Sequence, residues 1–93
     1  MNIEKTILDF QLSNTFEEYK SYMNAKEQQT ILKEMGVRIF YIGKLLDDPQ
    51  RATAIFQGSE NFLYDIFMNP ETKPIVENSG HIYAGTKITR WIS

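Results

Sequence analysis

The sequence predicts an α+β fold, because an extended apolar segment, an amphipathic helical segment and another extended segment follow one another twice along the chain. The helical segments are expected at residues 15–35 and 59–78. Each is followed closely by a glycine, Gly36 or Gly80, which can take the left-handed conformation that ends a helix. Because right-handed strand–helix–strand connections place both helices on one side of a sheet, this order predicts a ferredoxin-like βαββαβ fold, a four-stranded antiparallel sheet with two helices on one face.

Length and composition limit the kind of protein this can be. The 93 residues are expected to form a single domain, residues 1–93, because a chain of this size cannot fill two cores. The absence of Cys excludes disulfides and thiolate ligands, and a net charge of -2 without clusters of Lys or Arg argues against nucleic acid and membranes as partners. The chain shows neither a secretory signal pattern nor a stretch near the roughly 18 apolar residues of a membrane span, so a cytoplasmic protein is expected.

The first half of the chain is expected to contain a strand, a helix and a second strand. Period-two alternation over residues 3–12 predicts the first strand. Thr15 and Glu18 have the spacing of a capping box, which predicts the start of the helix. The stretch at residues 24–30 is polar on all sides of the helix, which predicts a kink or an exposed segment there. Residues 37–44 are expected to form the second strand, with apolar side chains on both faces.

A turn is expected next, at residues 46–50, because Asp and Pro favour tight turns, and the third strand is expected at residues 52–57. Ser59 is a good N-cap for a second helix. The buried side of this helix is expected to comprise Phe62, Leu63, Ile66 and Phe67.

The end of the second helical segment is expected to be irregular. Pro70 interrupts the helix, so residues 70–78 are predicted to form a broken turn and one short helix. Residues 82–92 are predicted to form the last strand, with a bulge or bend at Gly85.

The second, third and last strands lack a clearly polar face, which bears on assembly. If helices cover one face of the sheet, the other face should be polar where it meets water. An identical subunit would cover that second face through a self-complementary two-fold interface, so a homodimer is expected. The alternative is a monomer that exposes a few aromatic side chains, as many protein surfaces do.

Four segments carry a resemblance to a known family: residues 16–23 (FEEYKSYM), 41–50 (YIGKLLDDPQ), 67–74 (FMNPETKP) and 80–91 (GHIYAGTKITRW). Through them the chain resembles a short bacterial family catalogued as a domain of unknown function, within the dimeric α/β-barrel superfamily. The resemblance implies the ferredoxin-like fold and a dimer. It implies no particular activity, because the superfamily includes cofactor-free monooxygenases, small-molecule isomerases and lyases, haem-degrading enzymes and proteins without known chemistry.

His81 is the candidate catalytic residue, because it is the only histidine and histidine is the side chain that titrates near neutral pH. It could act as a general base or as a single haem ligand; the alternative is an ordinary strand-edge histidine. No metal site is expected from one His and no Cys, and no nucleotide cofactor is expected from glycines that are scattered singly.

Side chains that combine an apolar body with a polar tip are the candidates for ligand binding. They are Tyr19, Arg38, Tyr41, Tyr83 and Trp91. A cavity between the helices and the sheet would suit a small apolar or aromatic ligand, and the alternative is that these residues pack in the core and the dimer interface.

Two functions therefore remain open. The first is a homodimer that binds a small apolar ligand or a protein partner in a regulatory or accessory role. The second is a cofactor-independent enzyme, similar to a monooxygenase or an isomerase, that acts on a small aromatic substrate with His81 as its base. A closed pocket that holds His81 together with Tyr, Arg or Asn side chains would favour the enzyme, whereas a pocket filled by side chains would count against it.

Overall fold

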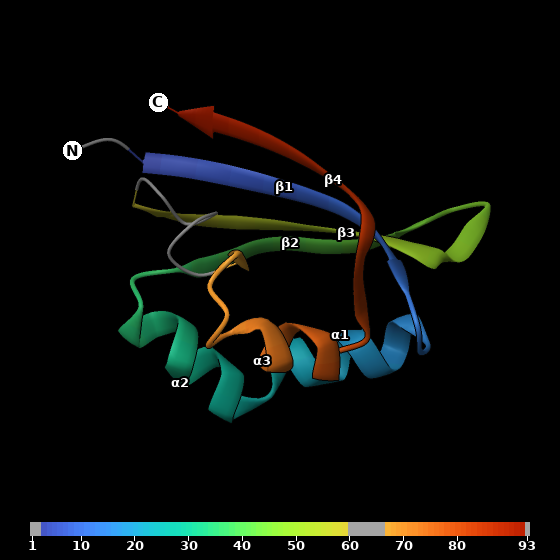
Figure 1. Cartoon of the computed structure of the whole chain (residues 1–93), viewed down its shortest axis with the longest axis horizontal. Helices are drawn as coiled ribbons and strands as arrows, with labels where there is room; N and C mark the ends of the chain where they lie inside the picture. Colours follow the sequence, from blue (N-terminus) through green and yellow to red (C-terminus); the bar gives the residue numbers. More distant parts are fainter. Residues whose placement is uncertain (1–2, 60–66, 93) are drawn as a thin grey trace.

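The computed structural model of the protein describes residues 3–59 and 67–92 (Figure 1). Its elements in chain order are β1 (Ile3–Leu12), α1 (Phe16–Asn24), α2 (Lys26–Glu34), β2 (Arg38–Leu45), β3 (Asp48–Ser59), α3 (Lys73–Asn78) and β4 (His81–Ile92). The strands form one antiparallel sheet in the order β2-β3-β1-β4, and the described helices lie on one face of it. This arrangement confirms the predicted ferredoxin-like fold.

The first helical segment consists of two helices. The capping box at its start is confirmed: the Glu18 backbone N–H donates to the Thr15 hydroxyl (3.1 Å), and the Thr15 backbone N–H donates to the Glu18 carboxylate (3.3 Å). Ala25 has extended backbone angles (φ -62°, ψ 143°), so it ends α1 and precedes α2. The predicted interruption of this helix therefore falls at Ala25.

The second helical segment is described only in its last part. The helix expected from Ser59, with Phe62, Leu63 and Ile66 on its buried side, lies for the most part outside the described residues. The short helix predicted within residues 70–78 is confirmed as α3, in which Pro74 occupies the second position. A proline is tolerated there because the first backbone N–H groups of a helix have no partner within it.

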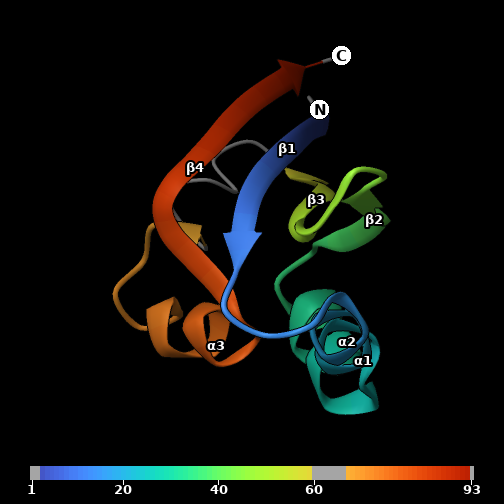
Figure 2. The ribbon, with the colours of Figure 1, turned by 90° about the vertical axis from the view of Figure 1, so that its right-hand side faces the viewer.

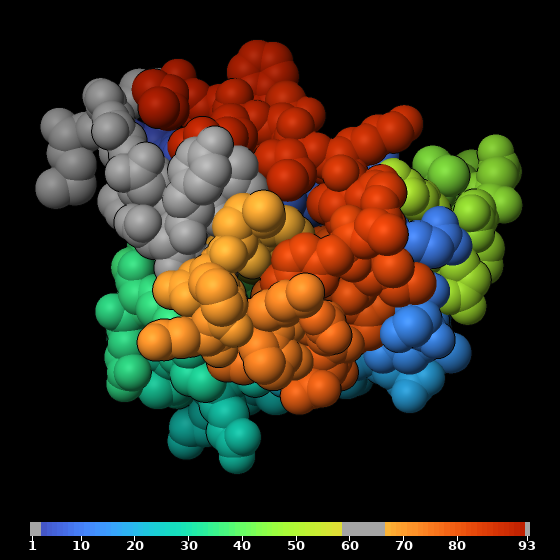
Figure 3. All heavy atoms as spheres, viewed as in Figure 1, coloured from blue at the N-terminus to red at the C-terminus, as the bar shows by residue number. Residues whose placement is uncertain are grey.

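The hairpin between β2 and β3 is longer than the sequence predicts. Only residues 46–47 form the turn, and Leu45 pairs with Asp48. Pro49 thus lies inside β3, which is possible because β1 pairs with β3 only from Arg51 onward and requires no N–H from Pro49. The predicted bounds of the turn and of the third strand were therefore wrong. The hairpin projects beyond the rest of the sheet (Figure 1), and its atoms, yellow-green in Figure 3, stand out at the edge of the molecule.

The two faces of the sheet differ in what covers them. The core lies between the helices and the face formed by the even-numbered residues of β1 (Figure 2). Its largest members include Leu8, Phe10, Tyr19, Phe56 and Phe67. The opposite face, here called the open face, has no described helix over it and exposes large apolar side chains. None of the described helices is long and apolar enough to cross a membrane.

Candidate functional site

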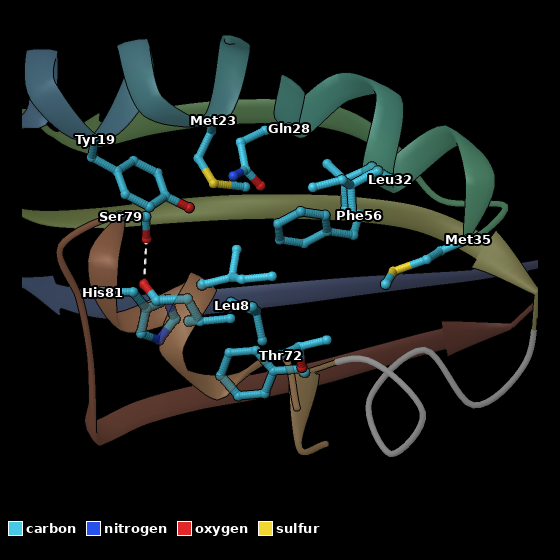
Figure 4. A pocket seen from close by; sticks show the side chains of 14 residues that line it. Leu8, Tyr19, Met23, Gln28, Leu32, Met35, Phe56, Thr72, Ser79 and His81 are labelled. Atoms are coloured by element: carbon cyan, nitrogen blue, oxygen red, sulfur yellow. Dashed lines mark hydrogen bonds between the residues drawn. The ribbon is translucent and has the colours of Figure 1, made fainter. Parts of the chain in front are cut away.

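A pocket with a volume of about 60 Å³ lies between the helices and the sheet (Figure 4). Its walls come from β1, β3, the start of β4 and all three described helices, and they are mostly apolar, as at Leu8, Leu32 and Phe56. For comparison, an engineered apolar cavity of about 150 Å³ binds benzene. The space present here therefore suits a ligand of a few heavy atoms, unless flexible wall residues such as Met23 and Met35 move aside.

The junction of α3 with β4 fixes the floor of the pocket. Gly80 has a φ of 103°, in the left-handed region, and a Cβ there would overlap the side chain of Asn14. Asn14 donates from Nδ2 to the Ser79 carbonyl (3.0 Å), and the Ser13 backbone N–H donates to the Gly80 carbonyl (2.8 Å). The segment between β1 and α1 therefore holds the start of β4, and with it His81, against the core.

His81 lies in an aromatic environment. Its ring stacks on Phe10, with centroids 3.8 Å apart and 12° between the planes, and it contacts Phe67 and Tyr83 at centroid distances of 5.2 and 5.6 Å. Only 4% of the residue is exposed. This burial lowers the pKa of His81 from 6.5 to about 4, because the charged imidazolium would lose its hydration. His81 is therefore neutral at physiological pH.

One hydrogen bond defines the tautomer of the His81 ring. Nε2 lies 3.0 Å from Oγ1 of Thr86, and the Thr86 hydroxyl donates its single proton to the carbonyl of Ile82 (3.0 Å). Nε2 must therefore carry the ring proton and donate it to Thr86, which leaves Nδ1 as an unprotonated acceptor. Within residues 3–59 and 67–92, no carboxylate forms a hydrogen bond with His81.

Tyr19 and Gln28 bring polar groups to the same pocket. Tyr19 is 2% exposed, its ring packs against Phe10 at 5.3 Å, and its hydroxyl points into the pocket (Figure 4). Burial raises the pKa of Tyr19, so its phenol stays protonated and able to donate. Gln28 extends from α2 with its amide turned toward the sheet (Figure 4).

The other sequence-predicted residues lie elsewhere. Tyr83 packs behind His81, and its hydroxyl donates to the carbonyl of Phe67 (3.0 Å). Arg38, Tyr41 and Trp91 belong to the open face, on the far side of the sheet from the pocket. The structure therefore brings His81 and Tyr19 together, with Tyr83 adjoining them, and does not bring the remaining three to this pocket.

Gln28 was missed as a pocket residue because the polar stretch at residues 24–30 was interpreted as exposed or kinked. The interruption at Ala25 starts a new helix, which sets the phase of α2. Gln28 precedes Ile31, Leu32 and Met35 at the spacing of residues on one face of a helix, and all three line the pocket. This helical spacing could have placed Gln28 in the pocket from the sequence.

A metal centre finds no support in the described part of the chain, where no group of three or more His, Cys, Asp or Glu side chains could hold an ion. The acidic residues near the hairpin turn have local roles: the backbone N–H of Gln50 donates to the Asp48 carboxylate (3.0 Å). The pocket itself offers hydroxyl, amide and imidazole groups in an apolar surrounding, which is the composition of a small-molecule site.

The chain has a ferredoxin-like fold, a four-stranded antiparallel sheet covered on one face by helices. The chain belongs to the family described as Domain of unknown function (DUF3764), which matches residues 3–93. The resemblance found in the sequence is thereby confirmed. No curated protein matches the chain.

Several solved structures share the fold. A proposed antibiotic biosynthesis monooxygenase from Bordetella bronchiseptica has a TM-score of 0.67 and 7% identity, covering 98% of this chain and 96% of that chain. A variant of SnoaB, a cofactor-independent oxygenase from Streptomyces nogalater, has a TM-score of 0.63 and 12% identity, covering 96% and 90%. A dimeric ferredoxin-like protein from an uncultured marine organism has a TM-score of 0.54 and 11% identity, covering 100% and 89%. At such identities the similarity concerns the fold alone.

Proposed function

We propose that this protein is a homodimer that binds a small apolar ligand in the pocket between its helices and its sheet, in a regulatory or accessory role in the cytoplasm. The observation that carries the proposal is an apolar pocket in which two uncharged polar side chains, Tyr19 and His81, are almost completely buried. Ligand sites typically combine apolar walls with a few placed polar groups.

The homodimer is supported by the open face. Tyr41, Ile55 and Ile7 are aligned in register across β2, β3 and β1, which makes an apolar row across this face. Tyr41 is 55% exposed and Trp91 is 61% exposed. An apolar surface that spans several strands is typical of an interface, and a protein of similar fold is described as dimeric.

A second candidate function is a cofactor-independent enzyme, which the similarity to SnoaB and the presence of His81 in the pocket favour. In this function Nδ1 of His81 would remove a proton from the substrate, and an isomerase-like reaction would return the same proton to another atom. A pKa of about 4 makes His81 a weak base, whereas catalysis is most efficient when the pKa lies near the working pH. Ligand binding is therefore the leading proposal.

The test is ligand-induced chemical shift change at the methyl groups of Leu8, Leu32 and Val76, measured by NMR with xenon and then with small apolar and aromatic metabolites. We expect saturable shifts at these methyl groups, since apolar cavities of this kind take up xenon. Val76→Phe, which fills the pocket, should abolish them. Ile88→Phe adds the same ring to a strand residue that does not line the pocket, and should preserve them.

The pocket would be refuted as a binding site if the probes shifted the methyl signals equally in Val76→Phe and Ile88→Phe. It would also be refuted if the probes caused no shift in the wild type. Suppose that the wild type turns over a bound metabolite, and that His81→Phe still binds this metabolite but no longer turns it over. This result would favour the enzyme over the binding protein.

A further inference from the structure

Two polar groups that point into the pocket have no partner within the described part of the chain. The Tyr19 hydroxyl and the Gln28 amide form no hydrogen bond with any residue in the described ranges, although Tyr19 is 2% exposed. By contrast, the other hydroxyls of the pocket are used by the backbone: Thr72 donates to the Asn69 carbonyl (3.0 Å), and Ser79 donates to the Val76 carbonyl. Gln28 is half-buried, whereas Tyr19 is almost completely buried, and polar groups of buried side chains are normally paired, so the Tyr19 hydroxyl in particular indicates a missing partner.

A ligand atom that accepts a hydrogen bond would pair with both groups. Tyr19 stays protonated inside the apolar wall, so its hydroxyl can donate, and the amide nitrogen of Gln28 is a second donor on the same side of the pocket (Figure 4). A carbonyl oxygen has two lone pairs and can accept from both.

The ligand must also be uncharged. The described residues that line the pocket include no Asp, Glu, Lys or Arg. His81 does not supply a positive charge either, because it is neutral at physiological pH. A carboxylate would lose its hydration on entry and find no cation in compensation, which makes its transfer unfavourable.

We propose that the pocket selects a small uncharged carbonyl compound, whose oxygen accepts a hydrogen bond from the Tyr19 hydroxyl beside the Gln28 amide while its carbon atoms fill the apolar part. This inference rests on the proposed ligand-binding function and specifies its ligand class. It makes Tyr19 the residue that determines specificity.

The experiment compares three probes of nearly equal shape by NMR titration: butanone, the alkene in which a methylene group replaces its carbonyl oxygen, and propionate. In the wild type we expect butanone and the alkene to bind and propionate not to bind. In Tyr19→Phe, butanone should bind about five- to tenfold more weakly, as the loss of one hydrogen bond predicts, while the affinity of the alkene changes less than about twofold. Gln28→Met should also weaken the binding of butanone more than the binding of the alkene.

The stability of Tyr19→Phe is an independent readout. Because the hydroxyl has no partner among residues 3–59 and 67–92, its removal should leave the melting temperature unchanged or raise it. A clear fall in melting temperature would mean that the hydroxyl serves the fold, and would overturn the inference.

The outcomes separate this inference from the proposed function. If the alkene binds but butanone binds no more weakly in Tyr19→Phe, or if propionate binds as well as butanone, the carbonyl inference fails and the apolar site stands. If none of the three probes binds in the wild type, the pocket holds no ligand of this kind, and both fail.

Discussion

His81 is a polar side chain that lies in apolar surroundings. Its ring lies between Phe10, Phe67 and Tyr83, and its one hydrogen bond, to Thr86, is made through the protonated nitrogen. The sequence marks this residue only as the single histidine. Its neutrality follows from burial among these aromatic residues, two of which, Phe10 and Phe67, come from other parts of the chain.

The depressed pKa of His81 predicts a pH dependence of stability. The unfolded chain, with an ordinary histidine pKa of 6.5, binds more protons than the folded protein does between that pH and about 4. The contribution of His81 is therefore complete above pH 6.5 and is lost as the pH falls toward 4, by about 3 kcal/mol at most. Urea denaturation of the wild type and of His81→Phe at several pH values would measure it.

The comparison with His81→Phe isolates this effect, because the variant keeps an aromatic ring against Phe10 and has no group that titrates there. Carboxyl groups titrate near the lower end of the same range in both proteins. If the free energy of unfolding changes equally with pH in the two proteins, the assigned pKa of His81 is contradicted. A weaker dependence on pH in His81→Phe would support it.

At the scale of the element, α1 is positioned by its first turn. Thr15 and Glu18 satisfy each other's backbone N–H groups, and Tyr19 follows immediately. Replacing Thr15 by Ala removes a side-chain acceptor, so we expect a loss of about 1 kcal/mol in the free energy of unfolding and fraying of the turn that carries Tyr19. Chemical denaturation measures the loss, and hydrogen exchange of the first backbone amides of α1 measures the fraying.

Thr30→Ala is the matched control for the cap. Thr30 lies on the exposed surface of α2, where its hydroxyl donates to the Lys26 carbonyl within the helix (2.9 Å). Alanine has a higher helix propensity than threonine, so this variant should be neutral or slightly more stable. A loss as large as that of Thr15→Ala would show that the cap has no special role.

The elements also show how far the sequence allows prediction. Features that depend on neighbouring residues were predicted, such as the capping box at Thr15 and the short helix that contains Pro74. The bounds of β3 were not, because pairing with β2 extends the hairpin past Pro49 and overrides the local turn preference. The presence of Tyr19 and His81 in one pocket could not be derived either, since they come from a helix and a strand far apart in the chain.

Trp91 and Tyr41 illustrate the same limit for the site. Both have the chemistry of ligand-binding residues, yet strand alternation and a bulge between Ile39 and Tyr41 place them on the open face. Composition alone could not assign them to a face. The apolar character of both faces was visible in the sequence, however, and the large exposed fractions of Trp91 and Tyr41 agree with it.

At the scale of the whole molecule, one side of the sheet is covered by helices and the other exposes an apolar row. The row of Tyr41, Ile55 and Ile7 runs across three strands, so a second copy of the chain could bury it against the same row. The helix side exposes apolar residues as well, such as Met35, which is 41% exposed at the end of α2. Exposure alone therefore does not distinguish the two sides, and charge substitutions on each side can.

We expect the wild type to have the mass of a dimer in size-exclusion chromatography with light scattering, and Tyr41→Glu to have the mass of a folded monomer. A carboxylate at position 41 would have to leave water when the open faces meet, which costs several kcal/mol without a partner. Met35→Glu makes the same change in charge on the helix side and should remain dimeric.

If the wild type is monomeric at micromolar concentration, or if Met35→Glu dissociates the dimer while Tyr41→Glu does not, the open face is not the interface. A retained circular dichroism spectrum in Tyr41→Glu separates dissociation from unfolding, because a strand residue that is 55% exposed tolerates a charge in the isolated subunit.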